Sequence, residues 1–149
     1  MKFKYSKIWY VVGLLLLGNL ASLAAAHKIG PREYGQLYFF DVGQGDAIYY
    51  RTSAGNDVLI DTGPGDAVLS KLGRAMPFFD RELELVILTH PHADHLDGLV
   101  EVLKRYNVGA VLETAVNHSI PEYAKWHELL KEKSVRVVIA KAGQKIIFF

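Results

Sequence analysis

The sequence predicts a mixed α/β domain that follows a hydrophobic helix at the N-terminus. Residues 8–26 form a run of 19 residues without a charge. From residue 37 onward, short apolar runs rich in strand-forming residues alternate with amphipathic stretches, and glycine-rich turns separate several of them. The chain has 149 residues, half of them hydrophobic, which fits one globular domain in addition to the N-terminal segment.

The N-terminal segment has the pattern of a secretory signal peptide. Lys2, Lys4 and Lys7 precede the apolar run, and three small residues, Ala24–Ala26, end it. The run also approaches the ~20 residues that span a bilayer, so an uncleaved anchor at residues 8–26 is an equal alternative. The domain is therefore expected outside the cytoplasm, either secreted or periplasmic, or membrane-anchored and facing outward.

Charge and cysteine content exclude two classes of protein. Without the three N-terminal lysines, 14 basic residues face 16 acidic ones, a net charge of −2, so the domain lacks the basic surface of a protein that grips nucleic acid electrostatically. An anionic phosphodiester would need bound cations for most of its attraction. Because the chain has no cysteine, it has no disulfide framework despite the expected export.

The predicted organisation has three parts: residues 1–26, a linker at 27–36, and a domain at 37–149. Within the domain we expect a hairpin of strands at 35–42 and 47–52, because Gly43-Gln44-Gly45-Asp46 forms a turn between them. The further expected elements are a strand at 58–60, a helix from Asp66 to about Leu72, a strand at 85–88, a helix ending at Arg105, a strand at 110–112, a helix from the Ser119–Glu122 capping box to about Lys133, a strand at 135–139 and a strand beginning at Ile146.

A cluster of metal-ligand residue types follows the apolar strand at 85–88. His90, His92, Asp94 and His95 occur within six positions. Imidazole and carboxylate are ligands that zinc and similar divalent metals accept. Surface histidines at a helix entrance are the alternative, but three imidazoles and a carboxylate directly after a buried strand have few structural uses. The pattern predicts a metal site.

The local backbone supports that prediction. Pro91 pushes His90 toward an extended conformation, in which residues two apart point the same way, so His90 and His92 can grip one ion together. Asp94 and His95 then stand at the start of an amphipathic helix, which carries Lys104 and Arg105 in its last turn.

Two residues outside this cluster are further candidates. Asp61 ends an apolar strand, where the loops of a sandwich gather, and support of the metal loop is favoured over a simple turn-forming role. His118 follows the strand at 110–112 and would line the cleft, although a polar loop residue is the favoured interpretation.

The spacing of His90, His92, Asp94 and His95 resembles the His-x-His-x-Asp-His motif of the metallo-β-lactamase superfamily. The resemblance implies an αββα sandwich with two divalent ions between its sheets, with zinc expected and manganese as an alternative. His90 and His92 would bind the first ion, and Asp94 and His95 the second. Asp94 would also be catalytic by orienting the attacking water. Asp61 would be the supporting first-motif aspartate rather than a ligand.

Three segments together resemble the competence-related, ComEC-type branch, whose hydrolases are associated with DNA uptake. They are residues 40–47, 59–63 and 89–95, and the resemblance covers about residues 37–149. It implies a phosphodiester or nucleic-acid substrate; a β-lactam or thioester carbonyl is the alternative. It places Asp41, Gln44 and Asp46 near the metal face without assigning their roles. No nucleotide cofactor is expected, and protein partners are left open.

The sequence departs from the family pattern downstream of the helix with the metal motif. The family's Gly-Asp bridging carboxylate and its late histidine motif do not occur, and residues from 27 onward supply about half of a sandwich. We therefore expect the N-terminal part of a longer protein or a truncated gene product. Catalytic zinc usually keeps three protein ligands, whereas two ions sharing these four residues would have two each. A non-catalytic metal-binding module is thus an alternative to the hydrolase.

Overall fold

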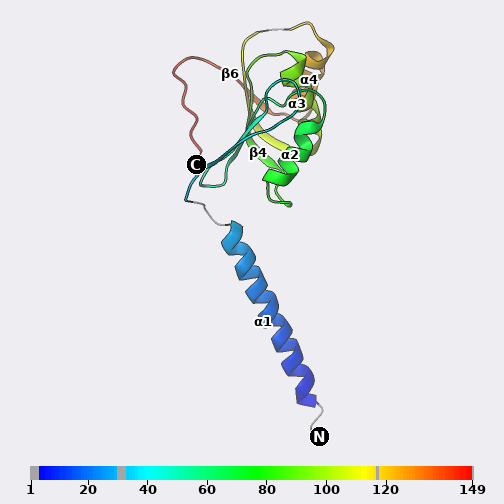
Figure 1. Cartoon of the computed structure of the whole chain (residues 1–149), viewed down its shortest axis with the longest axis vertical. Coiled ribbons are helices and arrows are strands. Elements are labelled where there is room, and N and C mark those ends of the chain that lie inside the picture. The colour runs from blue at the N-terminus through cyan, green and yellow to red at the C-terminus, as the bar shows by residue number, and fades with distance from the viewer. Residues whose placement is uncertain (1–3, 30–32, 117, 149) are drawn as a thin grey trace. The chain divides into compact units, whose positions relative to one another are not determined.

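The computed structural model describes residues 4–29, 33–116 and 118–148. The chain divides into two compact units, Met1–Arg32 and Glu33–Phe149. Helix α1, Lys4–Ile29, forms the first unit (Figure 1) and extends through residues 27–29, so the predicted linker at 27–36 begins inside a helix. In the parts of the chain described above, no helix combines the length and the apolar character needed to cross a membrane.

The second unit is built on one six-stranded sheet with the order β1-β2-β3-β4-β5-β6. Its strands are β1 Gln36–Phe39, β2 Ile48–Arg51, β3 Asp57–Ile60, β4 Glu82–Leu88, β5 Asn107–Glu113 and β6 Arg136–Ile139. The β1–β2 and β2–β3 pairs are antiparallel, which confirms the predicted hairpin. Strands β3 to β6 run parallel. The mixed α/β fold class is therefore confirmed.

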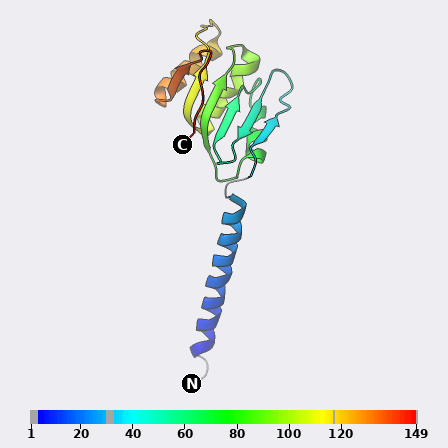
Figure 2. The same ribbon diagram turned by 90° about the vertical axis from the view of Figure 1, so that its left-hand side faces the viewer.

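A helix connects each successive pair of parallel strands. These helices are α2 Ala67–Ala75, α3 Ala93–Arg105 and α4 Pro121–Glu132. Crossovers between parallel strands are almost always right-handed, and the strand order advances in one direction, so all three helices cover the same face of the sheet. Figure 2 shows the strands side by side with these helices behind them.

The hydrophobic core lies between the sheet and the three helices. The central strands contribute Leu59, Val86 and Val111, each with no exposed surface. The helices contribute fully buried side chains at Val68, Leu72, Leu96, Leu99, Val102, Leu103 and Trp126. Burial of a side chain of this size contributes about 2 kcal/mol, so this layer holds the loops at the ends of the strands in place.

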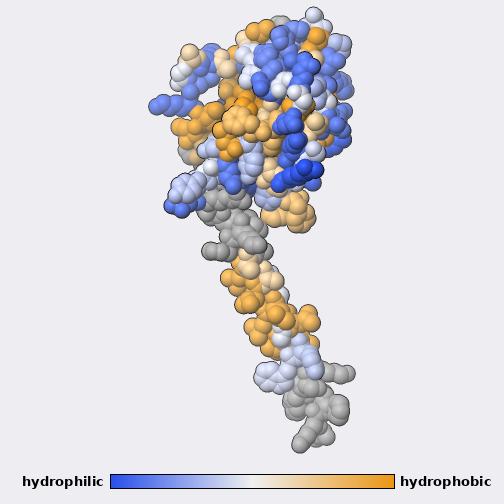
Figure 3. Space-filling view, viewed as in Figure 1, coloured by the Kyte–Doolittle hydropathy of each residue, from blue (hydrophilic) through white to orange (hydrophobic). Residues whose placement is uncertain are grey.

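The opposite face of the sheet is also apolar, and the C-terminal segment lies along part of it. Leu85 and Leu112 line a groove of about 500 Å³ together with residues 144–148. Figure 3 shows apolar side chains gathered over this part of the domain. The predicted strand beginning at Ile146 is wrong for the described residues up to 148. The turn in which Gln144 Oε1 accepts a hydrogen bond from Lys141 N leads the chain away from the edge strand β6, so it crosses the sheet instead of pairing with it.

The start of α4 also differs from the prediction. The helix begins at Pro121 with Ile120 as its N-cap residue and no side-chain cap, so the Ser119–Glu122 capping box does not form. Proline has the fixed φ of a first helical residue and needs no partner for an N–H, which sets the start two residues beyond Ser119. Asp66 does precede α2 as predicted, but its side chain makes no cap hydrogen bond.

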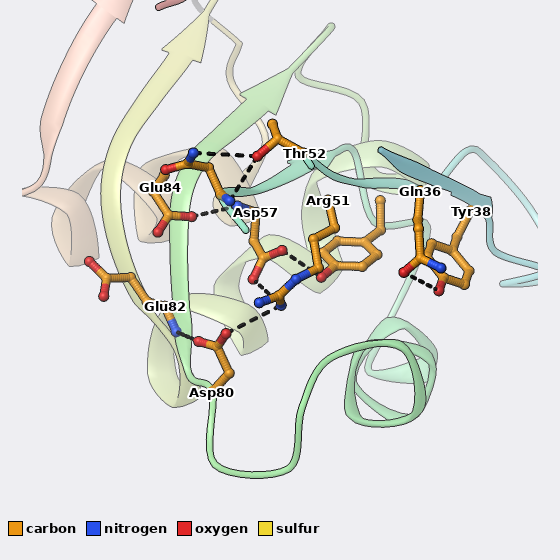
Figure 4. Close-up of polar contacts among 10 residues, drawn as sticks. Gln36, Tyr38, Arg51, Thr52, Asp57, Asp80, Glu82 and Glu84 are labelled. Carbon is orange, nitrogen blue, oxygen red and sulfur yellow. Dashed lines mark hydrogen bonds and ion pairs between the residues drawn. The ribbon is translucent and has the colours of Figure 1, made fainter. Parts of the chain in front are cut away.

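A buried polar cluster lies where β3 begins (Figure 4). Asp57 Oδ1 accepts a 2.7 Å hydrogen bond from Tyr49, and Asp57 Oδ2 pairs with Arg51 at 2.9 Å. Arg51 also reaches Asp80 at 3.3 Å, which ties the hairpin to the loop before β4. Burial raises the pKa of Asp57 to about 6, although Tyr49 and Arg51 act in the opposite direction.

Candidate metal centre

The predicted site residues follow three neighbouring parallel strands. Asp61 comes directly after β3, His90 follows β4, and His118 lies in the loop between β5 and α4. The carboxyl ends of parallel strands meet at one edge of a sheet, where α/β proteins commonly build their sites. These three loops therefore converge, although the residues are separated in the sequence.

Asp61 is a buried carboxylate with a strained backbone. Its φ of 51° lies in the left-handed region, which aspartate tolerates better than most residues, and only 2% of its surface is exposed. Oδ1 accepts a 2.9 Å hydrogen bond from Thr89 N. Oδ2 accepts a 2.5 Å bond from Thr89 Oγ1 and faces His95 Nδ1 at 2.9 Å. Because both oxygens are already occupied, Asp61 is suited to orient histidines rather than to act as a primary ligand.

These hydrogen bonds determine which nitrogen of each histidine carries the proton. The Thr89 hydroxyl donates its single proton to Asp61, so at 2.9 Å it can only accept a hydrogen bond from His90 Nδ1. The Asp61 carboxylate likewise accepts from His95 Nδ1. In both rings Nε2 is left with a free lone pair. This is the arrangement of metal-binding histidines whose other nitrogen is held by a carboxylate or hydroxyl.

The imidazoles lie together at this edge of the sheet. Ligand-type atoms of Asp61, His90 and His95 lie within 4.8 Å of one another, close enough to surround one ion. The ring centroids of His90 and His95 are 3.8 Å apart, and those of His90 and His92 are 4.8 Å apart. The ring of His118 neighbours that of His92, with 5.5 Å between the two centroids. Several imidazoles backed by a carboxylate fit zinc or a similar divalent metal.

The remaining predicted residues lie around this group. Asp94, half-buried, is the second residue of α3 and directly precedes His95, but it is not among the three residues within 4.8 Å of one another. The loop that carries Gln44 and Asp46 packs onto the start of α3, because a side chain at Gly45 would collide with the carbonyl oxygen of Asp94. Gln44 and Asp46 are exposed.

Asp41, also exposed, closes the turn of this glycine-rich loop by accepting a 3.2 Å hydrogen bond from Gly43 N. The structure thus brings the loop at 41–46 beside the histidine loop, while neither Asp41 nor the other exposed polar residues of the loop enter the ligand group.

Helix α3 is held tightly against the loop after β3. Thr62 N and Thr62 Oγ1 both donate hydrogen bonds to the carbonyl oxygen of His95, at 3.2 and 3.1 Å. Gly98 N donates to Gly63 O, and a Cβ at Gly98 would lie 2.7 Å from Thr62 Oγ1. The close approach requires glycine at position 98. It determines how far His95 stands from Asp61.

Sequence reasoning missed Thr89, which joins Asp61 to His90. Its position directly before His90, at the end of a buried strand, was the only signal, and a threonine there is also an ordinary strand residue. Its role depends on Asp61, 28 positions earlier, and could be recognised only once β3 and β4 were paired.

Comparisons with known proteins agree with this fold. A comparison with curated proteins gives no match. Among solved structures, a metallo-beta-lactamase candidate from Thermotoga maritima has a TM-score of 0.55 at 15% identity, covering 77% of this chain and 63% of its own length. A subclass B3 metallo-beta-lactamase from a soil metagenome has a TM-score of 0.47 at 22% identity, covering 58% of this chain. The chain spans about a third of the length of that enzyme, 34%.

The decisive comparison is with a family model. Residues 40–147, well over half of the chain, match the model described as the metallo-beta-lactamase superfamily. The matched range contains all three converging loops and every candidate ligand named above. This chain belongs to the metallo-beta-lactamase superfamily.

Proposed function

We propose that the chain forms the metal-binding part of a hydrolase that uses two divalent ions, with zinc favoured and manganese as the alternative. His90 and His92 would hold one ion, and Asp94 and His95 the other. The observation that carries the proposal is the hydrogen-bond set around Asp61, which engages Nδ1 of His90 and His95 and leaves Nε2 of both rings free to bind an ion. Two imidazoles held in this way have little rotational freedom to lose on binding a cation.

The residues of the chain would divide the work as follows. Divalent ions bound here would supply Lewis acidity and an activated water. Asp61 and Thr89 hold His90 and His95 in the correct tautomer, and Asp94, beside the ligands at the start of α3, orients the attacking water. The glycine-rich loop packed on Asp94 forms a neighbouring wall of the site.

For the substrate, we propose a phosphodiester or a nucleic acid, as in the ComEC-type branch. Support comes from the packing of the loop at 41–46 against the start of α3, since this loop distinguishes that branch in the sequence. The domain's net negative charge means that the bound cations would provide most of the attraction for such a substrate. An exported location, through the N-terminal apolar segment, is part of the same proposal.

A non-catalytic metal-binding module is the second candidate. It is favoured by the ligand group itself. Among the described residues, only Asp61, His90 and His95 have ligand-type atoms within 4.8 Å of one another. Such a group would hold an ion without completing two catalytic positions.

The test is zinc-dependent or manganese-dependent cleavage of bis(4-nitrophenyl) phosphate by this chain, with a β-lactam and a thioester assayed in parallel. His92→Ala removes a proposed ligand whose side chain is exposed, so the fold should tolerate it. We expect the phosphodiesterase rate to fall at least about tenfold. His127→Ala is the control, because His127 lies on α4 against Tyr123 and Glu113.

An unchanged rate in His92→Ala would contradict the hydrolase. Stoichiometric zinc without cleavage of any substrate would favour the binding module, and absence of bound metal would contradict both candidates.

A further inference from the structure

His118 is a histidine at the edge of the metal centre with an unsatisfied polar atom. Its Nδ1 is buried and has no hydrogen-bond partner among the described residues. A buried nitrogen without a partner costs about 1 to 3 kcal/mol, so a ligand that bonds to this atom would stabilise the fold. The sequence favoured a polar loop residue here, and a solvated side chain would not have this atom buried.

The surroundings of His118 show which ligand fits. Its ring stands edge-on to His92, with 5.5 Å between the centroids and an interplanar angle of 78°. His92 in turn stands edge-on to His90 at 4.8 Å. Three imidazoles from two different loops are thus linked by neighbouring ring contacts through His92. Imidazole nitrogens gathered in this way match a divalent metal of the zinc type.

The position of His118 is set by the fold rather than by the histidine motif. The loop after β5 leaves the sheet at the same edge as the loops after β3 and β4. Pro121 starts α4 immediately afterwards, and Trp126 anchors that helix by donating a 3.1 Å hydrogen bond to the buried Glu113 at the end of β5. Both ends of the short loop are therefore held, which keeps His118 beside His92.

We propose that His118 is a third imidazole ligand of the ion held by His90 and His92. The inference rests on the proposed function. It supplies what that function lacks, because catalytic zinc usually has three protein ligands and one open position, and the histidine motif alone provides two for this ion. His118 Nδ1 would be the ligating atom, and its burial keeps it available by excluding competing water.

The experiment measures metal binding, not activity. Zn²⁺ and Co²⁺ affinities of the full chain are determined by isothermal titration calorimetry, and the visible absorption of the Co²⁺ form is recorded for the wild-type chain, His118→Ala and His127→Ala. His127 is the matched control, because its Nε2 is also buried without a hydrogen-bond partner among the described residues, yet it faces Glu113 instead of the other imidazoles.

We expect His118→Ala to lower the affinity at least about tenfold and to change the Co²⁺ absorption bands, as expected when a bound imidazole is lost. His127→Ala should leave both unchanged. If His118→Ala binds as the wild-type chain does, the inference is wrong while the proposed function stands. If the wild-type chain binds neither metal, both fail.

A second measurement uses the unaltered protein, so it holds even if the variant does not fold. In wild-type protein labelled with ¹⁵N-histidine, Zn²⁺ should shift the Nδ1 resonance of His118 together with the ring resonances of His90 and His92. A His118 resonance that stays at its metal-free position at saturating Zn²⁺ would overturn the assignment.

Discussion

Strand β3 has a buried aspartate at each end, and the two serve different purposes. Asp57 at its start is 1% exposed, and Asp61 just after its end is 2% exposed. Asp57 is neutralised by the guanidinium of Arg51, whereas Asp61 is held by Thr89 and an imidazole. The ion pair between Asp57 and Arg51 leaves no group available for a ligand, because each charge is satisfied by the other. An imidazole has a second nitrogen, so the hydrogen bond to Asp61 leaves a ligand free for an ion.

The largest effect should come from breaking the arginine pair. Arg51→Ala would leave the Asp57 carboxylate buried without its cation, and removal of one partner of a buried pair typically costs about 3 to 5 kcal/mol. We expect the free energy of unfolding to fall by about 3 kcal/mol in urea denaturation. The affinity of the folded protein for Zn²⁺ should be unchanged, because Arg51, the last residue of β2, lies beside the start of β3, away from Asp61. A loss of affinity without a loss of stability would contradict the division of roles.

At the other end of β3, the effect should fall on metal binding. Asp61→Asn retains a residue that tolerates the left-handed backbone but replaces one carboxylate oxygen with an amide that cannot accept. We expect Zn²⁺ affinity to decrease about 10- to 100-fold, measured by competition with a chromophoric chelator. The matched variant Asp57→Asn should bind Zn²⁺ as tightly as the wild-type chain. Equal losses in both variants would mean that the site depends on the whole strand and not on Asp61.

A smaller effect should appear in the pH dependence of stability. Burial raises the pKa of Asp57 from its usual 3.8 to about 6, so between about pH 4 and pH 6 the folded state holds a proton that the unfolded state has lost. The contribution of Asp57 to stability therefore decreases as pH rises through this window and is constant above it. The slope for one proton cannot exceed about 1.4 kcal/mol per pH unit.

The measurement compares urea unfolding of the wild-type chain and Asp57→Asn from pH 4.5 to 7.5, with a chelator present to remove any metal. Relative to the wild-type chain, the free energy of unfolding of Asp57→Asn should increase as pH rises to about 6 and then remain constant. If the difference in free energy of unfolding between the two proteins did not change from pH 4.5 to 7.5, Arg51 would be keeping the Asp57 carboxylate ionised throughout.

The sequence predicted what depends on near neighbours. The strand before His90 and the helix after it were correct, because an apolar run, Pro91 and an amphipathic repeat all lie within 21 positions of one another. The same local pattern identified the candidate histidines. The convergence of the loops could be predicted only from the resemblance to the metallo-β-lactamase superfamily. No pattern within a short stretch of sequence indicates that the glycine-rich loop at 43–46 packs onto the start of α3.

What depends on distant neighbours could not be predicted. Thr89 receives its role from Asp61, and the Asp57 cluster needs both Arg51 and the loop that carries Asp80. The strand expected from Ile146 failed for the same reason, since a single apolar run does not reveal whether an edge strand is available to pair with it. In each case the deciding contact spans the fold.

Gly98 has a consequence for how the protein can change. The residue is buried in the middle of α3, and its bare backbone rests against Thr62 and the loop after β3. Replacement by even the smallest chiral residue would lift the helix and carry His95 away from its carboxylate, although position 98 itself touches no ion. A mutation can therefore abolish metal binding without replacing any ligand residue. A search for inactive relatives should inspect position 98 as carefully as the histidines.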